Sequence, residues 1–242
     1  MNNIQKFMQN FSIGILTGSG PEAGMHLWKM ILDDVRNDLG KLYLGDLQAP
    51  EFIIHSIPQL GLSMDFEKNQ IELWEALKVS LELMNGKVDV LCLSCNILHF
   101  FQNKIETNNF SFQFVSLVDT TIEYLIKNRI NEVGFISIPK VMDFSSISPY
   151  RKLNSICKVK FPTNFDKVVE IVNTIKKEGF VNECVKSNFE DVVEQLQVGN
   201  VVVACTELSL IQASQSSCVN YIDPMSLLAK KISLLFTQNN RF

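Results

Sequence analysis

The sequence has no long run of apolar residues and no excess of basic charge. No uncharged apolar stretch approaches the roughly 18 residues that a membrane-spanning helix needs. The patch Ser12–Leu16 is too short for a signal peptide and runs into a glycine turn, so we expect a cytoplasmic protein without membrane contact. With 22 basic and 26 acidic residues, the formal net charge is −4, and we expect no nucleic-acid partner.

Linkers, low-complexity tracts and short repeats are also missing from the sequence. The 242 residues are 46% apolar and 20% charged, which is ordinary for a globular protein with a substantial core. This length suits one large domain or two small ones.

What is present is an alternation of apolar strands with amphipathic helices. Such an alternation implies right-handed βαβ units and mostly parallel sheets. We predict an α/β fold of two pseudo-symmetric lobes, each a mostly parallel sheet flanked by helices. Residues 1–118 and 215–242 would form the N-terminal lobe and residues 119–214 the second. The expected strands are 11–16, 51–57, 88–94, 112–118, 132–138, 157–161, 200–204 and 219–223. The expected helices are 21–39, 66–84, 96–105, 119–127, 143–153, 166–177, 182–196 and a last one from Pro224. Asp119 would cap the helix over 119–127, and the last helix would return to the first lobe.

Six cysteines without a recognisable export signal indicate reduced thiols. The pair Cys92 and Cys95 has the spacing C-x-x-C, but no second pair exists for zinc, and thiols three residues apart on a strand point to opposite faces. We therefore expect neither a metal site nor a redox dithiol. Four cysteines lie in or beside apolar runs and are predicted to be small buried hydrophobes: Cys92, Cys157, Cys184 and Cys218.

The other two cysteines follow apolar strands, Cys95 after 88–94 and Cys205 after 200–204. The carboxyl ends of parallel strands are the usual ligand crevice of open α/β folds. A helix start lowers a thiol pKa below its reference of about 8.5, which favours a thiolate at Cys95. Two thiols facing each other across a cleft would form an acid/base pair for a carbon acid. His99, on the same helical face as Cys95, either assists it or is a packing histidine.

The glycine turn Gly18-Ser19-Gly20 precedes Pro21, where backbone N–H groups at a helix start can hold an anion. Its spacing to Gly24 is G-x-G-x-x-x-G, and no acidic residue ends the second strand, so a dinucleotide site is weakly supported. A small carboxylate is a better-sized ligand. A turn that serves only close packing is an equal alternative.

Four stretches resemble, in order, the signature stretches of the aspartate/glutamate racemase family: Ile13–Ala23, Cys95–His99, Ala204–Leu210 and Tyr221–Ala229. The resemblance spans nearly the whole chain. It implies two α/β lobes with the active site in the cleft between them, no cofactor and no metal, and a homodimer. It also implies that Cys95 and Cys205 remove and return the α-proton of an amino acid from opposite faces, with aspartate or glutamate as the expected substrate.

The same resemblance implies how the substrate is held. The α-carboxylate would contact the turn amides and polar side chains that follow the strands, and a lysine ahead of Glu178-Gly179 would hold the side-chain carboxylate. Lys177 matches that lysine, although Lys176 is an equally good register. The implied binding residues are Gly18, Ser19, Gly20, Ser56, Asn96, Ser137, Lys177 and Thr206, with His99 and Glu207 supporting the cysteines.

The sequence departs from the family pattern at positions that would bind the substrate. Ile97 stands where a polar residue is usual, Pro139 has no N–H to donate, and residues 58–63 contain no arginine. Two alternatives therefore stay open. One is a related isomerase or decarboxylase of a small dicarboxylate that uses Cys95 or Cys205 as nucleophile or proton donor. The other is a carboxylate-binding protein with a decayed site.

Overall fold

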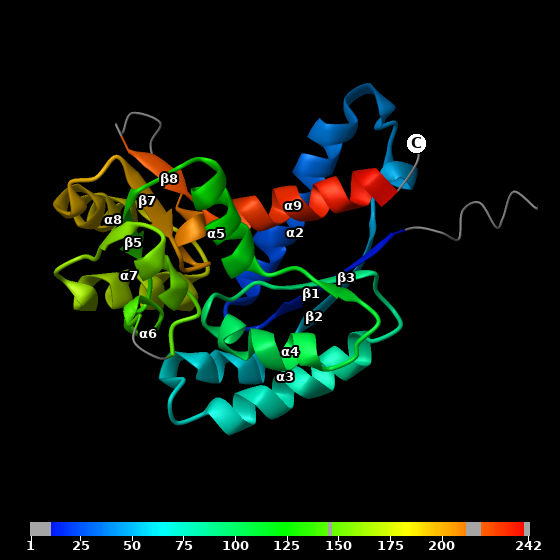
Figure 1. The fold of residues 1–242 in the computed structure, drawn as a ribbon, viewed down its shortest axis with the longest axis horizontal. Coiled ribbons are helices and arrows are strands. Elements are labelled where there is room, and N and C mark those ends of the chain that lie inside the picture. The colour runs from blue at the N-terminus through cyan, green and yellow to red at the C-terminus, as the bar shows by residue number, and fades with distance from the viewer. Residues whose placement is uncertain (1–10, 145–146, 212–218, 240–242) are drawn as a thin grey trace, which may run out of the picture.

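The structure, a computed structural model, describes residues 11–144, 147–211 and 219–239. Two four-stranded sheets lie at its centre, in the orders β2-β1-β3-β4 and β6-β5-β7-β8. Every strand pair is parallel. Figure 1 shows the sheets as the centres of two lobes that lie side by side. The predicted α/β fold with two similar lobes is confirmed.

The strands occupy equivalent places in the two sheets: β5, β6, β7 and β8 of the second sheet correspond to β1, β2, β3 and β4 of the first. The central strands β1 and β5 are buried apart from half-buried Glu132, as expected for parallel strands covered on both faces. The first sheet contains β1 (Ser12–Thr17), β2 (Glu51–Ser56), β3 (Val90–Leu93) and β4 (Gln113–Phe114), and the second contains β5 (Glu132–Ile136), β6 (Lys158–Lys160), β7 (Asn200–Val203) and β8 (Asn220–Ile222).

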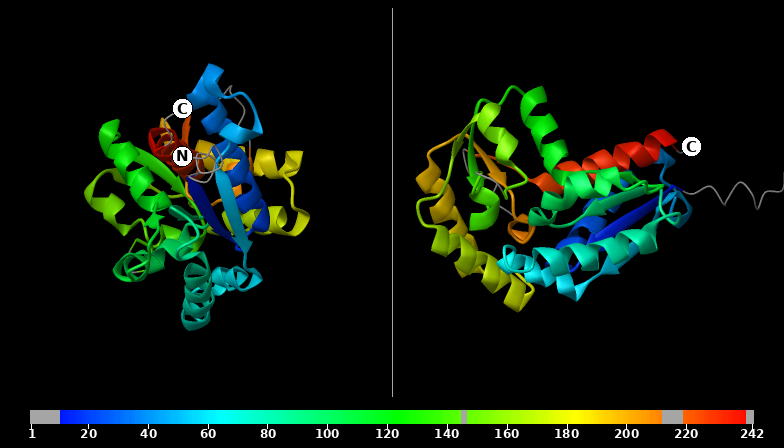
Figure 2. Two further views of the ribbon diagram at one scale, coloured as in Figure 1. Left: turned by 90° about the vertical axis from the view of Figure 1, so that its right-hand side faces the viewer. Right: turned by 60° about the horizontal axis from the view of Figure 1, so that its bottom comes forward.

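Helices cover the faces of both sheets, as the two further views in Figure 2 show. Their apolar residues recur at helical spacing, so that α2 buries Ala23, Leu27, Ile31 and Val35 against the first sheet. None of the described helices is long and apolar enough to cross a membrane. The helices are α2 (Pro21–Leu39), α3 (Gln70–Met84), α4 (Gln102–Thr107), α5 (Leu117–Lys127), α6 (Pro139–Met142), α7 (Phe165–Glu178), α8 (Glu183–Leu196) and α9 (Pro224–Asn239).

Two helical predictions are corrected. The helix expected over 143–153 is replaced by α6 and a 3-10 turn, Arg151–Ser155, because Pro139 opens a helix early and Pro149 disfavours the helical conformation just before it. The start of α5 also differs. Ser116 caps it by accepting a hydrogen bond from the Asp119 backbone N–H at 3.1 Å, so Asp119 is not the cap.

The predicted lobe boundary also changes. Strand β8 pairs with β7, so the second lobe includes residues up to Ile222, although the sequence placed 215–242 in the first lobe. Residues 214 and 215 lie outside the described residues. Helix α9 packs on α2 as expected, with Ser233 Oγ donating to Asp38 Oδ2 at 2.7 Å. The chain therefore crosses back to the first lobe between β8 and α9.

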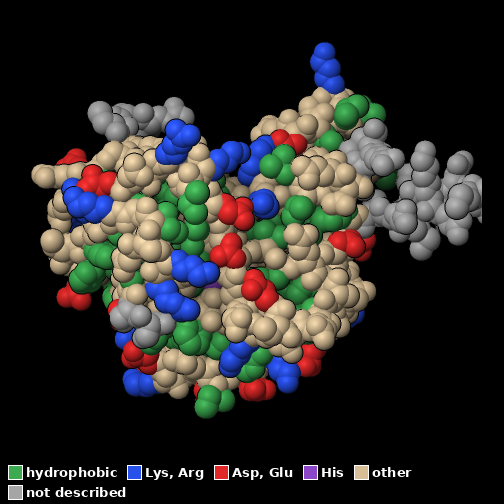
Figure 3. Space-filling model, viewed as in Figure 1, with side chains coloured by type: hydrophobic (Ala, Val, Ile, Leu, Met, Phe, Trp, Pro, Cys, Tyr) green, Lys and Arg blue, Asp and Glu red, His purple; other side chains and the backbone are tan. Residues whose placement is uncertain are grey.

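Both signs of charge gather at the middle of the face drawn in Figure 3, where the lobes meet. One ion pair ties α9 to α5, with Lys231 Nζ at 3.2 Å from Glu123 Oε2. Both side chains are largely exposed, so the pair contributes little to stability. Between the lobes, α9 packs on α5.

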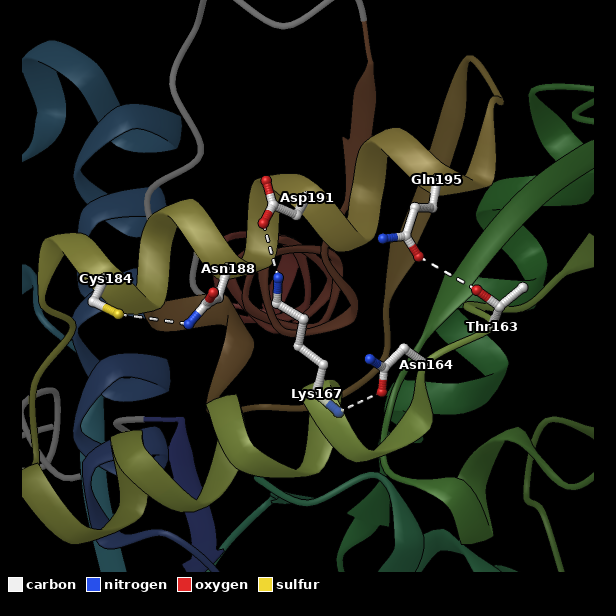
Figure 4. Close-up of polar contacts among 7 residues, drawn as sticks. All are labelled: Thr163, Asn164, Lys167, Cys184, Asn188, Asp191 and Gln195. Atoms are coloured by element: carbon white, nitrogen blue, oxygen red, sulfur yellow. Dashed lines mark hydrogen bonds and ion pairs between the residues drawn. The ribbon is translucent and has the colours of Figure 1, made fainter.

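In the second lobe, α7 and α8 lie side by side on the outer side of the sheet, and Figure 4 shows the polar contacts between them. Lys167 Nζ lies 2.8 Å from Asp191 Oδ2, and Thr163 Oγ1 donates to Gln195 Oε1 at 3.4 Å. Asn164 caps α7 by accepting from the Lys167 backbone N–H at 3.0 Å. These contacts fix α7, whose last turns face the other lobe.

Three of the four cysteines predicted to be buried can be placed. Cys92 and Cys157 are buried, and Cys92 Sγ donates to the Gly14 carbonyl at 3.5 Å within the first sheet. Cys184 is exposed instead, because it lies on the solvent side of the first turn of α8, where Asn188 Nδ2 donates to its sulfur at 3.6 Å (Figure 4). Cys218 lies outside the described residues.

Candidate active site

One cavity between the lobes contains both cysteines that follow the strands. Cys95 comes two residues after β3 and Cys205 two residues after β7, the equivalent strand of the second sheet. Each lobe therefore supplies one thiol from the carboxyl edge of its sheet. The other lining residues are Ser19, Ser63, Met64, Asn96 and Ile97 of the first lobe and Ser137, Ile138, Val141, Val172, Lys176, Ala204, Thr206 and Glu207 of the second.

The cavity is small. Its volume is about 20 Å³, which is room for about one water molecule. A ligand larger than water would need the lobes to part or the lining side chains to retract.

Cys95 lies 7% exposed at the first wall of the cavity. Burial raises the pKa of its thiol, and the charge of Glu207 raises it further. A hydrogen bond from the Ser19 hydroxyl, the Leu98 backbone N–H and the charge of Lys176 act in the opposite direction. The short helix start, a 3-10 turn over Ile97–Phe101, does not outweigh burial. The pKa of Cys95 is therefore raised overall and not lowered as expected from the helix start.

Cys205 has a different neighbour. Its Sγ donates to Glu207 Oε2 at 3.1 Å, and the thiol is 6% exposed. Burial raises the pKa of Cys205 well above its ordinary value, and the Glu207 carboxylate adds to the rise both by charge and by accepting this hydrogen bond. Cys205 thus holds its proton firmly.

Glu207 also forms a buried ion pair. Its Oε1 lies 2.5 Å from Lys176 Nζ, and the side chains are 6% and 21% exposed, respectively. Burial lowers the pKa of Lys176, but the carboxylate outweighs burial and raises it overall. Gly20 makes room for this pair, since a Cβ there would stand 2.4 Å from Glu207 Oε1 and the backbone φ is +93°.

The amide of Asn96 is held by a tyrosine of the other lobe. Tyr150, fully buried, donates from Oη to Asn96 Oδ1 at 2.7 Å. This contact fixes which end of the amide accepts. The Asn96 Nδ2 is buried and has no hydrogen-bond partner in the described part of the chain. The amide nitrogen is therefore free to donate to a ligand of the cavity.

No family model matches the sequence, and no curated protein does. Solved structures do match. An aspartate racemase from Picrophilus torridus has a TM-score of 0.79 at 18% identity, covering 93% of this chain and 94% of that one. The fold is that of the aspartate and glutamate racemases. A glutamate racemase from Francisella tularensis in complex with D-glutamate has a TM-score of 0.64 at 16% identity, covering 95% of this chain and 82% of that one. An aspartate racemase homologue from Pyrococcus horikoshii has a TM-score of 0.70 at 21% identity, covering 93% of this chain and 99% of that one.

Within this racemase fold, His99 lies behind the cavity rather than in it. Its Nε2 accepts from the Leu117 backbone N–H at 3.1 Å, so the neutral ring carries its proton on Nδ1, which donates to the Cys95 carbonyl at 2.9 Å. Burial lowers the pKa of His99 to about 4. His99 is the packing histidine of the two alternatives, and it joins the end of β3 to the start of α5.

Several predicted binding residues lie where the sequence placed them. Thr206 and Ser137 line the cavity, with Thr206 Oγ1 at 3.5 Å from Glu207 Oε2 and Ser137 Oγ donating to the Ala204 carbonyl at 2.5 Å. Ser19 lines it too, and its hydroxyl lies 2.6 Å from that of Ser63.

Other predicted residues lie elsewhere. Gly18 packs against the residue that follows β2, because a Cβ there would stand 2.1 Å from the Ile57 carbonyl oxygen. Ser56 is exposed at the end of β2, away from the cavity. Lys177 lines a separate surface depression on α7. Lys176 lines the cavity instead, because consecutive helical residues point about 100° apart.

Sequence reasoning missed Ser63 and Tyr150. Ser63 belongs to the 3-10 segment Pro58–Asp65, within a stretch singled out for having no arginine. Tyr150 falls in the segment predicted to be one helix, 143–153. No motif around either residue predicts its place in the site, because each reaches the site through a contact with a residue distant in the sequence.

Proposed function

We propose that the protein is a cofactor-independent amino-acid racemase in which Cys95 and Cys205 transfer the α-proton. The observation that carries this proposal is that the two thiols, at equivalent strand ends of two lobes, line one cavity. The racemase fold supports it. The chemistry needs one proton acceptor and one proton donor on opposite faces of a carbon, and two thiols supply both.

In the proposed mechanism, one thiolate removes the α-proton and the opposite thiol donates its proton to the other face of the same carbon. The bond from carbon to the first hydrogen breaks, its electron pair moves toward the carboxylate, and a new bond to hydrogen forms on the far side. The substrate leaves inverted, with the proton positions of the two sulfurs exchanged. The Asn96 amide N–H donates to the carboxylate as negative charge develops there.

The surroundings of the sulfurs favour one resting assignment. Burial raises the pKa of both thiols, and Glu207 adds to the rise most at Cys205, to which it is hydrogen-bonded. At Cys95 the Ser19 hydroxyl and the Leu98 N–H act against the rise. When one proton is lost from the pair, Cys95 is therefore the thiolate and Cys205 the thiol. The free enzyme is poised for the enantiomer whose α-hydrogen faces Cys95.

The resemblance implies aspartate or glutamate as substrate, and also a cytoplasmic homodimer. Lys177, expected to hold the distal carboxylate, lies outside the cavity, and Lys176 is the cation among the described lining residues. The oligomeric state is checked by sedimentation equilibrium.

The proposal is tested by following the α-hydrogen in deuterated water. Each enantiomer of a panel of amino acids is incubated with the protein, and NMR and optical rotation record deuterium uptake and inversion. We expect both to proceed together for at least one amino acid. A covalent adduct trapped on Cys95 or Cys205 would support an isomerase or decarboxylase instead, and tight carboxylate binding without exchange would support a binding protein.

A further inference from the structure

Two serine hydroxyls are in contact at the wall of the cavity that the first lobe supplies. Ser19 Oγ and Ser63 Oγ lie 2.6 Å apart, and the two residues are 5% and 2% exposed. Both residues line the cavity that contains Cys95 and Cys205. Because water barely reaches these hydroxyls, their hydrogen-bond partners are other groups of the site.

The backbone around Ser63 is held in place independently of this contact. Ser63 belongs to the 3-10 segment Pro58–Asp65. Asn69 Nδ2 donates to the Leu62 carbonyl at 3.3 Å and to the Asp65 carbonyl at 2.8 Å, one on each side of Ser63. The fold therefore sets the position of the Ser63 hydroxyl, and a change confined to that hydroxyl leaves these anchors intact.

The Ser19 hydroxyl also reaches the sulfur of Cys95. Burial raises the pKa of Cys95, and the hydrogen bond from Ser19 acts against that rise. A hydroxyl has one proton to donate, and a thiolate can only accept. When Ser19 donates to the Cys95 thiolate it has no second proton for Ser63, so Ser63 is the donor in the contact between the two hydroxyls.

The three side chains then form a chain in which Ser63 donates to Ser19 and Ser19 donates to Cys95. Hydrogen bonds to an ionised acceptor are stronger than those between neutral groups. Consecutive hydrogen bonds in a buried site also polarise one another. Donation from Ser63 makes the Ser19 hydroxyl a better donor to the sulfur, and it replaces the alternative in which Ser19 donates to Ser63.

We propose, building on the racemase function above, that Ser63 is a positioning residue for Cys95. By donating to Ser19, Ser63 commits the Ser19 hydroxyl proton to the Cys95 sulfur and so favours the thiolate that removes the α-proton. Cys205, whose sulfur donates to Glu207, is not part of this chain. In this role Ser63 acts through Ser19 and needs no contact with the substrate.

The first test measures the reactivity of the thiols and needs no substrate. The full chain is treated with iodoacetamide at a series of pH values, and mass spectrometry of its peptides follows Cys95 and Cys205 separately. Because alkylation consumes the thiolate, Ser63→Ala should lower the rate at Cys95 at pH 7 by about 3- to 10-fold. The rate at Cys205, which lines the same cavity, should change far less and reports any change in access.

The matched control is Ser80→Ala. Ser80 is also 2% exposed, but its hydroxyl donates within α3 to the Ala76 carbonyl at 2.9 Å. This variant should alkylate at Cys95 like the parent. An unchanged Cys95 rate in Ser63→Ala, or an equal fall at Cys95 and Cys205, would overturn the inference and leave the racemase function standing.

A second pair of variants covers the case in which Ser63→Ala does not fold. Ser63→Thr and Ser63→Val introduce side chains of nearly the same shape, and the threonine alone keeps a hydroxyl. The Cys95 rate should therefore be several-fold lower in Ser63→Val than in Ser63→Thr. Equal Cys95 rates in these two variants would contradict the inference.

The second test asks whether Ser63 acts through Ser19. Ser19→Ala removes the direct donor and should lower the Cys95 rate by about 10-fold or more. In that background Ser63→Ala should have little further effect, because the group that it directs is gone. Additive losses would mean that Ser63 reaches Cys95 by another route, and the inference would be wrong.

The third test uses turnover of an amino acid that the parent racemises. Ser63→Ala should lower kcat/KM at neutral pH and move the acidic limb of its pH profile to higher pH, with KM little changed. A higher KM with an unchanged limb would assign Ser63 to substrate binding and overturn the inference. If the parent racemises no amino acid, the proposed function is wrong, and the alkylation rates still decide the role of Ser63.

Discussion

In the first lobe strand β3 leads to Cys95, and in the second lobe the equivalent strand β7 leads to Cys205. The backbones around the two thiols are alike, and both side chains reach the same cavity. Their neighbours differ. Cys95 has neutral donors, the Ser19 hydroxyl and the Leu98 N–H, whereas Cys205 donates to the Glu207 carboxylate.

This difference divides the work between two similar lobes. The repeated sheet sets the positions of the sulfurs, and the side chains around each sulfur set its pKa. Environments that push the pKa values of two titratable groups apart assign acid and base roles. Cys205, beside a carboxylate, keeps its proton longer, so the pair is asymmetric although the lobes are similar.

The largest expected effect comes from removing either sulfur. Cys95→Ser and Cys205→Ser should each slow racemisation by about 10³-fold or more, because a hydroxyl is a much weaker base than a thiolate. The residual exchange should differ, since each variant keeps one thiol. Each should still exchange the α-hydrogen of one enantiomer, and the two variants should prefer opposite enantiomers, as read by NMR in deuterated water.

The control for these variants is Cys184→Ser, at the exposed cysteine of α8, which should racemise at the parent rate. Parent-like rates in both Cys95→Ser and Cys205→Ser would disprove the two-thiol mechanism. Residual exchange from the same enantiomer in both variants would contradict the placement of the sulfurs on opposite faces.

A smaller effect is expected from displacing the Glu207 carboxylate, which accepts the hydrogen bond from Cys205. Gly20→Ala places a Cβ 2.4 Å from Glu207 Oε1 and should lower kcat/KM by about 10- to 100-fold by displacing that carboxylate. Gly86→Ala is matched, since its φ is +74° and no atom lies within 4 Å of the new Cβ. Both should lose about 1 kcal/mol of stability for the left-handed backbone, measured by urea unfolding. Equal activities in the two variants would show that Glu207 does not need this space.

The next effect concerns the environment of Cys95. Tyr150→Phe removes the donor to Asn96 Oδ1 and lets the amide turn, which should lower kcat/KM by about 5- to 30-fold, equivalent to roughly 1–2 kcal/mol. In an Asn96→Ala background the same change should have little effect, because the group that it positions is gone. Tyr43→Phe, distant from the cavity, should have no effect. Additive losses in the double variant would contradict the positioning role.

The sequence was sufficient to predict both thiols and the two-lobed fold. Apolar strands that lead to Cys95 and Cys205 predict that each thiol lies at the carboxyl edge of its own sheet, where ligands usually bind. The family resemblance implied Asn96, Ser19 and Thr206 as binding residues, and all three line the cavity.

Contacts made across the fold were not predictable in this way. Lys176 and Lys177 differ by one residue, and only the exact rotation of α7 decides which reaches Glu207. Tyr150 reaches Asn96 from a segment whose helix was predicted wrongly because Pro149 interrupts it. Ser56 follows a strand end but lies on an edge strand, where its side chain meets solvent.

The smallest expected effect concerns His99, which supports the strand end that leads to Cys95. Burial lowers its pKa to about 4 in the folded protein, against an ordinary value of 6.5. Between these values the unfolded chain binds a proton that the folded protein does not, so stability falls as the pH drops from 6.5 toward 4. From pH 7.5 to 5.5 the free energy of unfolding should fall by roughly 1 kcal/mol on this account.

Urea unfolding at both pH values checks this prediction, with His99→Gln compared with the parent. The variant is expected to be less stable at pH 7.5, because it loses hydrogen bonds to Cys95 and Leu117, and to show a smaller drop at pH 5.5. His26, half-buried with a pKa also lowered by burial, provides the control His26→Gln, which should keep the part of the pH dependence due to His99. If His99→Gln and the parent lost equal stability on acidification, His99 would not be the buried neutral group that ties β3 to α5, and the support of Cys95 would have to come from Ser19 and the 3-10 turn alone.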